Sequence, residues 1–270
     1  MDSPEIMLGT FRNNDYQELL KVVQAAVECG FTGFDTAPSY RSEEVLGKAI
    51  NEVARSYGLH REDFFISDKI DAWQMQENNG DIRKYVDDAI NKMKVGYLDL
   101  LLIHWPVPEY IDNTWKCFER LYEEGIVKHI GICNLRVRHL KKYIRYDIPL
   151  QYLQIERHPL RTSEQEVQYC REHGIKVMSY SPLCQMDERL RTNKKLKQIS
   201  EKYGKNIGQV ILRWHIDTGC IPVFMSRKPD RVKENLDIFD FSLTKEEIKI
   251  ISSLNENYKL FLESWGCLGF

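Results

Sequence analysis

The sequence predicts an α/β protein folded as a closed (β/α)8 barrel of parallel strands, known as a TIM barrel. Three observations support this prediction. Short apolar runs alternate with longer segments of helical periodicity, a pattern typical of successive βα units. The apolar runs number eight, which is the strand count that closes such a barrel. No Pro/Gly-rich linker, low-complexity tract or longer repeat interrupts the chain, so residues 1–270 are expected to form one domain.

Each expected strand is a short apolar run bounded by polar or turn-forming residues. In chain order the strands are IMLGTF (6–11), FTGFD (31–35), FFISDK (64–69), DLLLIH (99–104), HIGIC (129–133), YLQIE (152–156), KVMSY (176–180) and IPVF (221–224).

The segments between the strands carry signals for helix starts and stops. Three of them begin with the capping-box spacing, in which a Ser, Thr or Asp precedes a Glu by three positions. These pairs are Asp15 with Glu18, Ser163 with Glu166 and Thr244 with Glu247. The last pair opens LTKEEIKIISSL (243–254), which lies too far beyond the eighth strand to be its closing helix. We therefore expect an added C-terminal helix followed by a tail.

Composition restricts the cellular setting and the partners. A formal charge of −2 gives no electrostatic reason to expect nucleic acid or an anionic membrane as a partner. The seven cysteines show no C-x-x-C spacing and the seven histidines no H-x-x-x-H spacing, so neither a disulfide framework nor a metal site is expected. The amino terminus lacks the features of a signal peptide, and no apolar run is long enough to cross a bilayer. A cytoplasmic protein is expected.

Four side chains that carry chemistry fall at or near three consecutive strand ends. Asp35, Lys69 and His104 each finish an expected strand, and Tyr40 lies in the loop after the first of these. Each alone has an ordinary explanation, such as a helix cap, a surface charge or a packed ring. Because the strand ends of a βα barrel converge on one rim, the four together predict an active site there. Asp35 and Lys69 are expected to pair, since an unpaired charge near the barrel interior is costly.

At these residues the chain resembles the aldo-keto reductases over nearly its whole length. The similar blocks are LGTF (8–11), GFDTAPSYRSEEVLG (33–47), the lysine of ISDK (66–69), LLIHWPVP (101–108), GICN (131–134), QIERHP (154–159), SYSPL (179–183) and PDRVKEN (229–235). The resemblance implies a catalytic set of Asp35, Tyr40, Lys69 and His104. It implies reduction of an aldehyde or ketone by hydride transfer, with the chain acting as a monomer on a small-molecule carbonyl substrate.

The physical chemistry of tyrosine makes these implied roles reasonable. A free phenol has a pKa of about 10 and is a weak acid at neutral pH. An adjacent ammonium favours the phenolate, so Lys69, held by Asp35, is expected to lower the pKa of Tyr40. Tyr40 would then protonate the carbonyl oxygen, while His104 orients the carbonyl and stabilises developing negative charge.

The resemblance also implies a nicotinamide cofactor, although the G-x-G-x-x-G fingerprint is absent from the sequence. It places Asn134 and Gln154 at the carboxamide and Tyr180 against the ring. The full implied set is Thr10, Asp35, Cys133, Asn134, Gln154, Tyr180, Ser181, Leu183, Ser226, Arg227, Arg231, Glu234 and Asn235. Two positions depart from the family pattern, since Cys133 replaces a common serine and Met225 replaces the lysine that faces a 2′-phosphate. NADPH is expected because Arg227 can substitute for that lysine, with NADH as the alternative.

The predicted substrate pocket is aromatic, with Phe11, Trp105 and Trp73 as its walls. Asp71 stands where many relatives carry a tryptophan, and it would either place a carboxylate near the mouth or cap the following loop. The tail aromatics Trp265 and Phe270 are further candidates. Two other functions stay open at this point, namely a Schiff-base aldolase that uses Lys69 and a nucleotide-sensing regulatory barrel with little turnover.

Overall fold

Eight parallel strands close into one barrel, with the strand order β1 to β8 following the sequence. The structure is a computed structural model that describes residues 3–143 and 146–262. The strands are β1 (Met7–Gly9), β2 (Gly33–Asp35), β3 (Phe65–Ile70), β4 (Leu100–Ile103), β5 (Ile130–Cys133), β6 (Tyr152–Glu156), β7 (Lys176–Tyr180) and β8 (Cys220–Phe224). Pairing of β1 with β8 completes the closure. The predicted barrel and its eight strands are therefore confirmed, with β1, β2, β4 and β5 shorter than expected.

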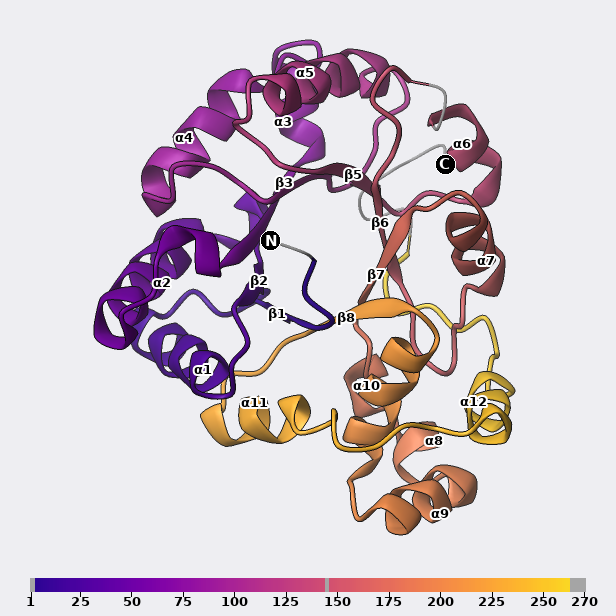
Figure 1. The fold of residues 1–270 in the computed structure, drawn as a ribbon. Coiled ribbons are helices and arrows are strands. Elements are labelled where there is room, and N and C mark those ends of the chain that lie inside the picture. Colours follow the sequence, from indigo (N-terminus) through magenta and orange to yellow (C-terminus); the bar gives the residue numbers. More distant parts are fainter. Residues whose placement is uncertain (1–2, 144–145, 263–270) are drawn as a thin grey trace.

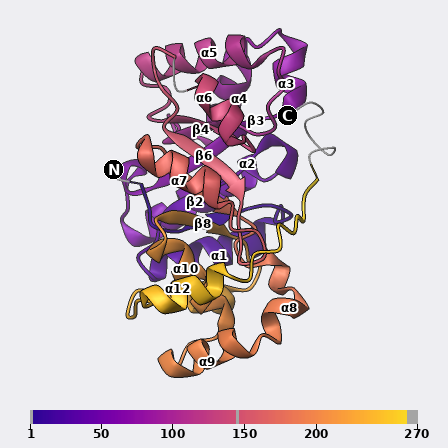
Figure 2. The same cartoon turned by 90° about the vertical axis from the view of Figure 1, so that its right-hand side faces the viewer.

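Helices form a ring outside the barrel (Figure 1). They are α1 (Tyr16–Glu28), α2 (Glu43–Tyr57), α3 (Ala72–Glu77), α4 (Arg83–Met93), α5 (Ile111–Glu123), α6 (Val137–Tyr143), α7 (Glu164–Glu172), α8 (Glu188–Arg191), α9 (Lys194–Tyr203), α10 (Ile207–Asp217), α11 (Pro229–Leu236) and α12 (Lys245–Ser252). Between β7 and β8 lie α8, α9 and α10, and α9 projects beyond the ring (Figure 2). The predicted extra C-terminal helix is α12.

Strand parity decides which side chains enter the barrel, since successive residues of a strand point to opposite faces. In β4, Leu100 and Leu102 join the apolar cluster inside the barrel, whereas Leu101 and Ile103 pack outward. By the same alternation Phe65 lies inside, and so Lys69, four residues further along β3, also points inward. The barrel interior is thus apolar at one end and polar towards the carboxyl ends of the strands.

Two of the three predicted helix caps are confirmed. Asp15 accepts a hydrogen bond from the backbone N–H of Glu18, and the side chains of Thr244 and Glu247 form a reciprocal capping box. The cap predicted at Ser163 is wrong. Ser163 has a left-handed backbone with φ of 48°, and its hydroxyl donates to the carbonyl of Glu156 instead. In the described part of the chain, no helix has both the length and the apolar character needed to cross a bilayer.

Candidate active site

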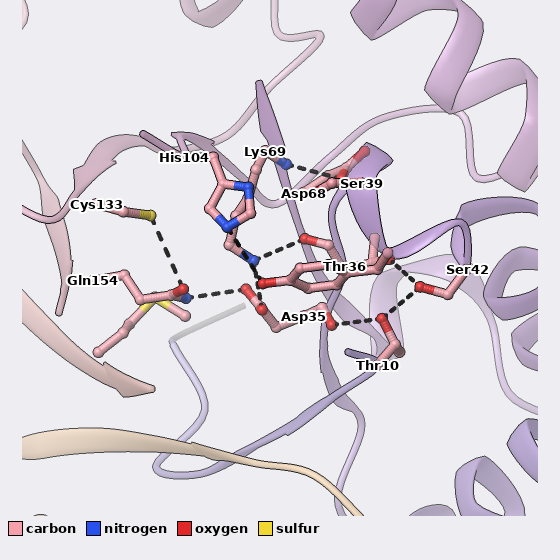
Figure 3. Close-up of polar contacts among 12 residues, drawn as sticks. Thr10, Asp35, Thr36, Ser39, Ser42, Asp68, Lys69, His104, Cys133 and Gln154 are labelled. Carbon is pink, nitrogen blue, oxygen red and sulfur yellow. Dashed lines mark hydrogen bonds and ion pairs between the residues drawn. The ribbon is translucent and has the colours of Figure 1, made fainter. Parts of the chain in front are cut away.

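A buried ion pair forms the base of the site. Lys69 donates from Nζ to Oδ2 of Asp35 at 2.6 Å and to the carbonyl of Thr36 at 2.8 Å (Figure 3). The second carboxylate oxygen of Asp35 accepts from Gln154 at 3.1 Å. Burial disfavours the ammonium, but Asp35, Tyr40 and Cys133 together outweigh it and raise the pKa of Lys69 above its ordinary value. The predicted pairing of Asp35 with Lys69 is confirmed, and Lys69 is a permanent cation at neutral pH.

The loop after β2 brings Tyr40 over this pair. Tyr40 ends the short 3-10 helix η1 (Pro38–Tyr40). Its hydroxyl lies 3.4 Å from Nε2 of His104, and its ring centroid lies 5.1 Å from Nζ of Lys69. The Phe11 ring packs edge-on against it at 5.1 Å. The structure therefore brings together all four side chains that the sequence singled out.

Three buried hydroxyl groups fix the loop that carries Tyr40. Ser42 Oγ lies 2.8 Å from Thr10 Oγ1 and 3.0 Å from Thr36 Oγ1, and Thr10 also donates to the carbonyl of Asp35 (Figure 3). Sequence reasoning missed Thr36 and Ser42, although both lie inside the recognised block 33–47. The side chain of Thr10 is fully buried in this cluster, and a cofactor contact of Thr10 stays a prediction.

The acidity of Tyr40 differs from the expectation. Burial raises the pKa of Tyr40 above its ordinary value, and Lys69 lowers it but does not overcome the burial. The predicted influence of Lys69 has the right sign, whereas the predicted net lowering is wrong for the protein without ligands. The phenol is therefore protonated at neutral pH, and its hydroxyl hydrogen is available for donation.

His104 directly follows β4 and is held from behind by a carboxylate. Its Nδ1 lies 2.5 Å from Oδ1 of Asp71, whose other oxygen accepts from the backbone N–H of Ser39 at 2.9 Å. Asp71 is also the N-cap residue of α3, where its backbone N–H donates to Oε1 of Gln74 at 2.8 Å. Its carboxylate binds His104 and Ser39. The contact between Asp71 and His104 was not predicted, because the two residues lie in different loops, one after β3 and the other after β4.

The residues assigned to the nicotinamide end form a connected group at the ends of β5 to β7. Asn134 donates to the carbonyl of His104 at 3.0 Å and accepts from the Tyr180 hydroxyl at 2.9 Å. Cys133 is buried, with Sγ 3.9 Å from Oε1 of Gln154. Gln154 is buried as well, whereas Asn134 and Tyr180 are partly exposed. Tyr180 thus lies partly exposed beside the amide of Asn134.

The residues assigned to the phosphates and adenine lie around the ends of β7 and β8. Ser181 has a left-handed backbone with φ of 49°, and Leu183 is partly buried in the same loop. Ser226 accepts from the N–H of Lys228 at 3.1 Å just before α11. Within α11, Arg231 and Glu234 are exposed and Asn235 is buried.

The hydrogen-bond donors around the end of β8 and the start of α11 suit a phosphate. Arg227 is half exposed and crosses to the β1 loop, where it donates to the carbonyl of Arg12 and lies 3.7 Å from Glu18. The amino terminus of α11 adds backbone N–H groups and the positive end of a helix dipole. Guanidinium groups bind phosphate in a forked geometry. Together with the partly exposed Tyr180, these donors fit a dinucleotide, and Met225, 42% exposed, adds no charge.

Two of the predicted pocket aromatics lie next to the candidate catalytic side chains, Phe11 against the Tyr40 ring and Trp105 near His104. Phe11 is 37% exposed, and the Trp105 ring lies 6.3 Å from that of His104. Trp73 is 52% exposed and packs on Tyr85 of α4 at 5.4 Å, so its part in a substrate pocket stays a prediction.

The chain beyond α12 also reaches the site. The backbone N–H groups of Leu260 and Phe261 donate to the carboxylate of Glu156 at 2.7 and 3.0 Å. This places the Phe261 ring 6.5 Å from Phe11 and 5.8 Å from Tyr180. The sequence prediction did not select Phe261. The usable signal was Glu156, a carboxylate at the inward-facing end of β6 that needs a hydrogen-bond donor. The predicted tail aromatics Trp265 and Phe270 lie outside the described residues.

A closed βα barrel with an Asp, a Lys, a Tyr and a His joined at its strand ends defines a class of oxidoreductases, and comparison with known proteins identifies the family. The model of the aldo/keto reductase family matches residues 5–256. The chain belongs to this family.

Named relatives and solved structures agree with this assignment. The chain is 34% identical to methylglyoxal reductase DkgA of Escherichia coli over 95% of its length and 91% of the relative's. It is also 34% identical to glyoxal reductase of Bacillus subtilis, over 96% and 92% of the two chains. The structure of a Bombyx mori aldo-keto reductase in complex with NADP superposes with a TM-score of 0.88 at 30% identity, covering 97% of this chain and 93% of that one.

Proposed function

We propose that the protein reduces an aldehyde or ketone to the alcohol with NADPH, using Tyr40 as the general acid. The observation that carries this proposal is the position of the Tyr40 hydroxyl, which faces His104 while its ring lies over the Lys69 ammonium. General acid catalysis requires a donor within hydrogen-bonding reach of the oxygen that gains the proton. We infer that a carbonyl bound beside Phe11 and His104 would receive its proton from the Tyr40 hydroxyl.

The side chains divide the work of the proton transfer. The reduced nicotinamide supplies the hydride when bound, held by Asn134 and Tyr180 at the ring. The Tyr40 hydroxyl gives its proton to the carbonyl oxygen and becomes a phenolate. Lys69 stabilises this phenolate, because an ammonium close to a phenolate favours the charged form. Asp35 keeps the lysine in place and balances its charge in the barrel interior.

Preference for NADPH is proposed from the cations that remain near β8. The methionine at position 225 leaves no point charge for a 2′-phosphate, but Arg227 and Arg231, two and six residues further along the chain, are exposed. Arginine binds phosphate more specifically than a single ammonium does. The NADP complex of the Bombyx mori structure supports this choice.

Small dicarbonyl compounds are the substrates we propose to test first. Relatives that share 34% of the sequence are named methylglyoxal and glyoxal reductases. We propose that the rings of Phe11, Trp105 and Phe261, which lie near Tyr40 or its partner His104, border the site for a compact aldehyde. We further propose that the protein works as a cytoplasmic monomer, which size-exclusion chromatography and fractionation of the source cells would test.

The aldolase alternative requires a neutral Lys69, since only the free amine attacks a carbonyl. The buried ion pair with Asp35 and the raised pKa of Lys69 oppose that state. Failure of borohydride to trap an adduct with candidate aldehydes is the expected result.

The test of the proposed function is a turnover panel read at the nicotinamide absorbance. Methylglyoxal, glyoxal and aromatic aldehydes are offered with NADPH and, at matched concentration, with NADH. Turnover with NADPH above that with NADH is expected. Tight cofactor binding without turnover across the panel would instead support the regulatory barrel, and equal or faster turnover with NADH would overturn the cofactor preference.

A further inference from the structure

The contact between His104 and Asp71 determines where the imidazole carries its proton. Asp71 is the N-cap residue of α3 in the loop after β3. Its carboxylate accepts from the N–H of Ser39 at 2.9 Å and meets Nδ1 of His104 at 2.5 Å. Both carboxyl oxygens are therefore engaged, and the Asp71 side chain is 8% exposed. The Ser39 hydroxyl also donates to Oδ1 of Asp71, at 3.3 Å.

The partners of Asp71 favour its ionised form. Burial works against ionisation, but the hydrogen bonds from His104 and Ser39 outweigh it and hold the pKa of Asp71 below its ordinary value. An ionised carboxylate can only accept hydrogen bonds, so the proton of this contact lies on Nδ1 of His104. The hydrogen bond made by one ring nitrogen decides the state of the other.

The second nitrogen of His104 faces the reaction centre. Burial lowers the pKa of His104 below its ordinary value, and the hydrogen bond to Asp71 only partly opposes this. The imidazole is neutral at neutral pH, with its single proton on Nδ1. Nε2 then presents a lone pair towards the Tyr40 hydroxyl, 3.4 Å away. In this state His104 can accept a hydrogen bond at the site and cannot donate one.

We propose that Asp71 is a positioning residue that makes Nε2 of His104 a hydrogen-bond acceptor at neutral pH and a donor to the substrate oxygen only after the ring binds a second proton. The inference rests on the proposed carbonyl reduction, because it concerns the same oxygen that Tyr40 protonates. It assigns to Asp71 an influence on the reaction that a loop cap alone would not have.

The protonation state of His104 then distinguishes the two substrates of a reversible reaction. A carbonyl oxygen carries no hydrogen, so it gains a bond only from Nε2–H of the doubly protonated ring. An alcohol hydroxyl can instead donate to the bare Nε2 of the neutral ring. Neutral His104 therefore favours binding of the alcohol. The imidazolium, which keeps its salt bridge to Asp71, favours binding of the carbonyl compound.

This difference gives a pH dependence with a definite sign. The charged groups facing the ring are Asp71 and Asp35, which favour its protonation, and Lys69, which opposes it, while the Tyr40 hydroxyl is neutral. Because burial lowers the pKa of His104 below its ordinary value, the imidazolium forms only at acidic pH. The kcat/KM of carbonyl reduction should fall as pH rises through the pKa of His104, by up to about tenfold per pH unit.

The first test locates the proton without measuring turnover. The full chain is labelled with 15N-histidine, and the ring nitrogens are observed by NMR at pH values above neutrality, with His104→Gln identifying the resonances of His104. We expect the signature of a protonated Nδ1 and a bare Nε2. A protonated Nε2 with a bare Nδ1 would overturn the proposal. This result is independent of the proposed function, which fails separately if no carbonyl is reduced.

The second test compares pH profiles of reduction. Asp71→Leu removes the acceptor at Nδ1, so the neutral ring can carry its proton on Nε2 and donate to the carbonyl without a second proton. We expect its kcat/KM to lose the decline with rising pH, and Asp71→Glu to restore at least part of that decline. The control is Asp112→Asn, whose carboxylate binds Lys142 on the surface, and it should keep the wild-type profile. The same decline in Asp71→Leu as in the wild type would contradict the proposal.

Discussion

Replacing Lys69 by methionine tests how much the buried ion pair contributes to stability. The lysine side chain is fully buried and that of Asp35 is 4% exposed, so the substitution leaves a carboxylate with no cation inside the barrel. Gln154 remains as its hydrogen-bond donor at 3.1 Å. Removing one partner of a buried pair typically costs about 3–5 kcal/mol. We expect Lys69→Met to lower the free energy of unfolding by about this amount.

Urea denaturation at several pH values provides the assay. With a slope of about 3 kcal/mol/M, the midpoint should fall by about 1–2 M at neutral pH. The stranded carboxyl of Asp35 should acquire a raised pKa in the folded variant, so protonation removes the penalty and the deficit should shrink as pH falls from about 8 to about 5. The double variant Asp35→Leu/Lys69→Met should recover much of the loss. A midpoint within about 0.3 M of wild type would refute the reasoning.

Three further predictions concern other parts of the molecule. Met225→Lys should strengthen the binding of NADPH relative to that of NADH by about tenfold, because it adds a cation for the 2′-phosphate. Unchanged dissociation constants for both cofactors would contradict the proposed cofactor placement. Glu156→Ala should speed hydrogen exchange at the Phe261 amide by about tenfold or more, since a bond to a charged group is lost, and unchanged protection would refute the role of this carboxylate. Gly47→Ala should lower the free energy of unfolding by about 1–3 kcal/mol, although alanine favours helix more than glycine does. The reason is that the added Cβ would lie 2.3 Å from the backbone of Met93. A higher melting temperature would contradict this and show that α2 and α4 separate easily.

Much of the fold could be predicted because periodicity records burial. The eight apolar runs became the eight strands, and their ends placed Asp35 and His104 correctly. Of the helices between β7 and β8, α8 has only four residues and carries little periodic signal, whereas α9 and α10 begin at the caps Asn193 and Asn206, which the sequence prediction did not use. The cap at Ser163 failed for a different reason. Its spacing to Glu166 fits a capping box, but its backbone is left-handed and its hydroxyl donates to the carbonyl of Glu156 instead.

The site was predictable in membership but not in electrostatics. Residue types at strand ends indicated the four central side chains, because barrel topology alone brings those ends together. The raised pKa of Tyr40 depends on how completely the loop covers the ring, which the sequence does not encode locally. The bond from Asp71 to His104 depends on a side-chain direction. That direction is set only when the loops after β3 and β4 fold side by side.

Exchange of Tyr40 for phenylalanine measures the central claim most directly, since it removes one oxygen and keeps the ring against Phe11. Reduction of the best carbonyl in the panel is compared with NADPH affinity measured by fluorescence on the same preparation. Loss of a positioned general acid lowers rates by about 10²- to 10⁴-fold. We expect kcat to fall by that amount with cofactor affinity little changed. A variant that retained most of the wild-type kcat would show that the proton comes from another group.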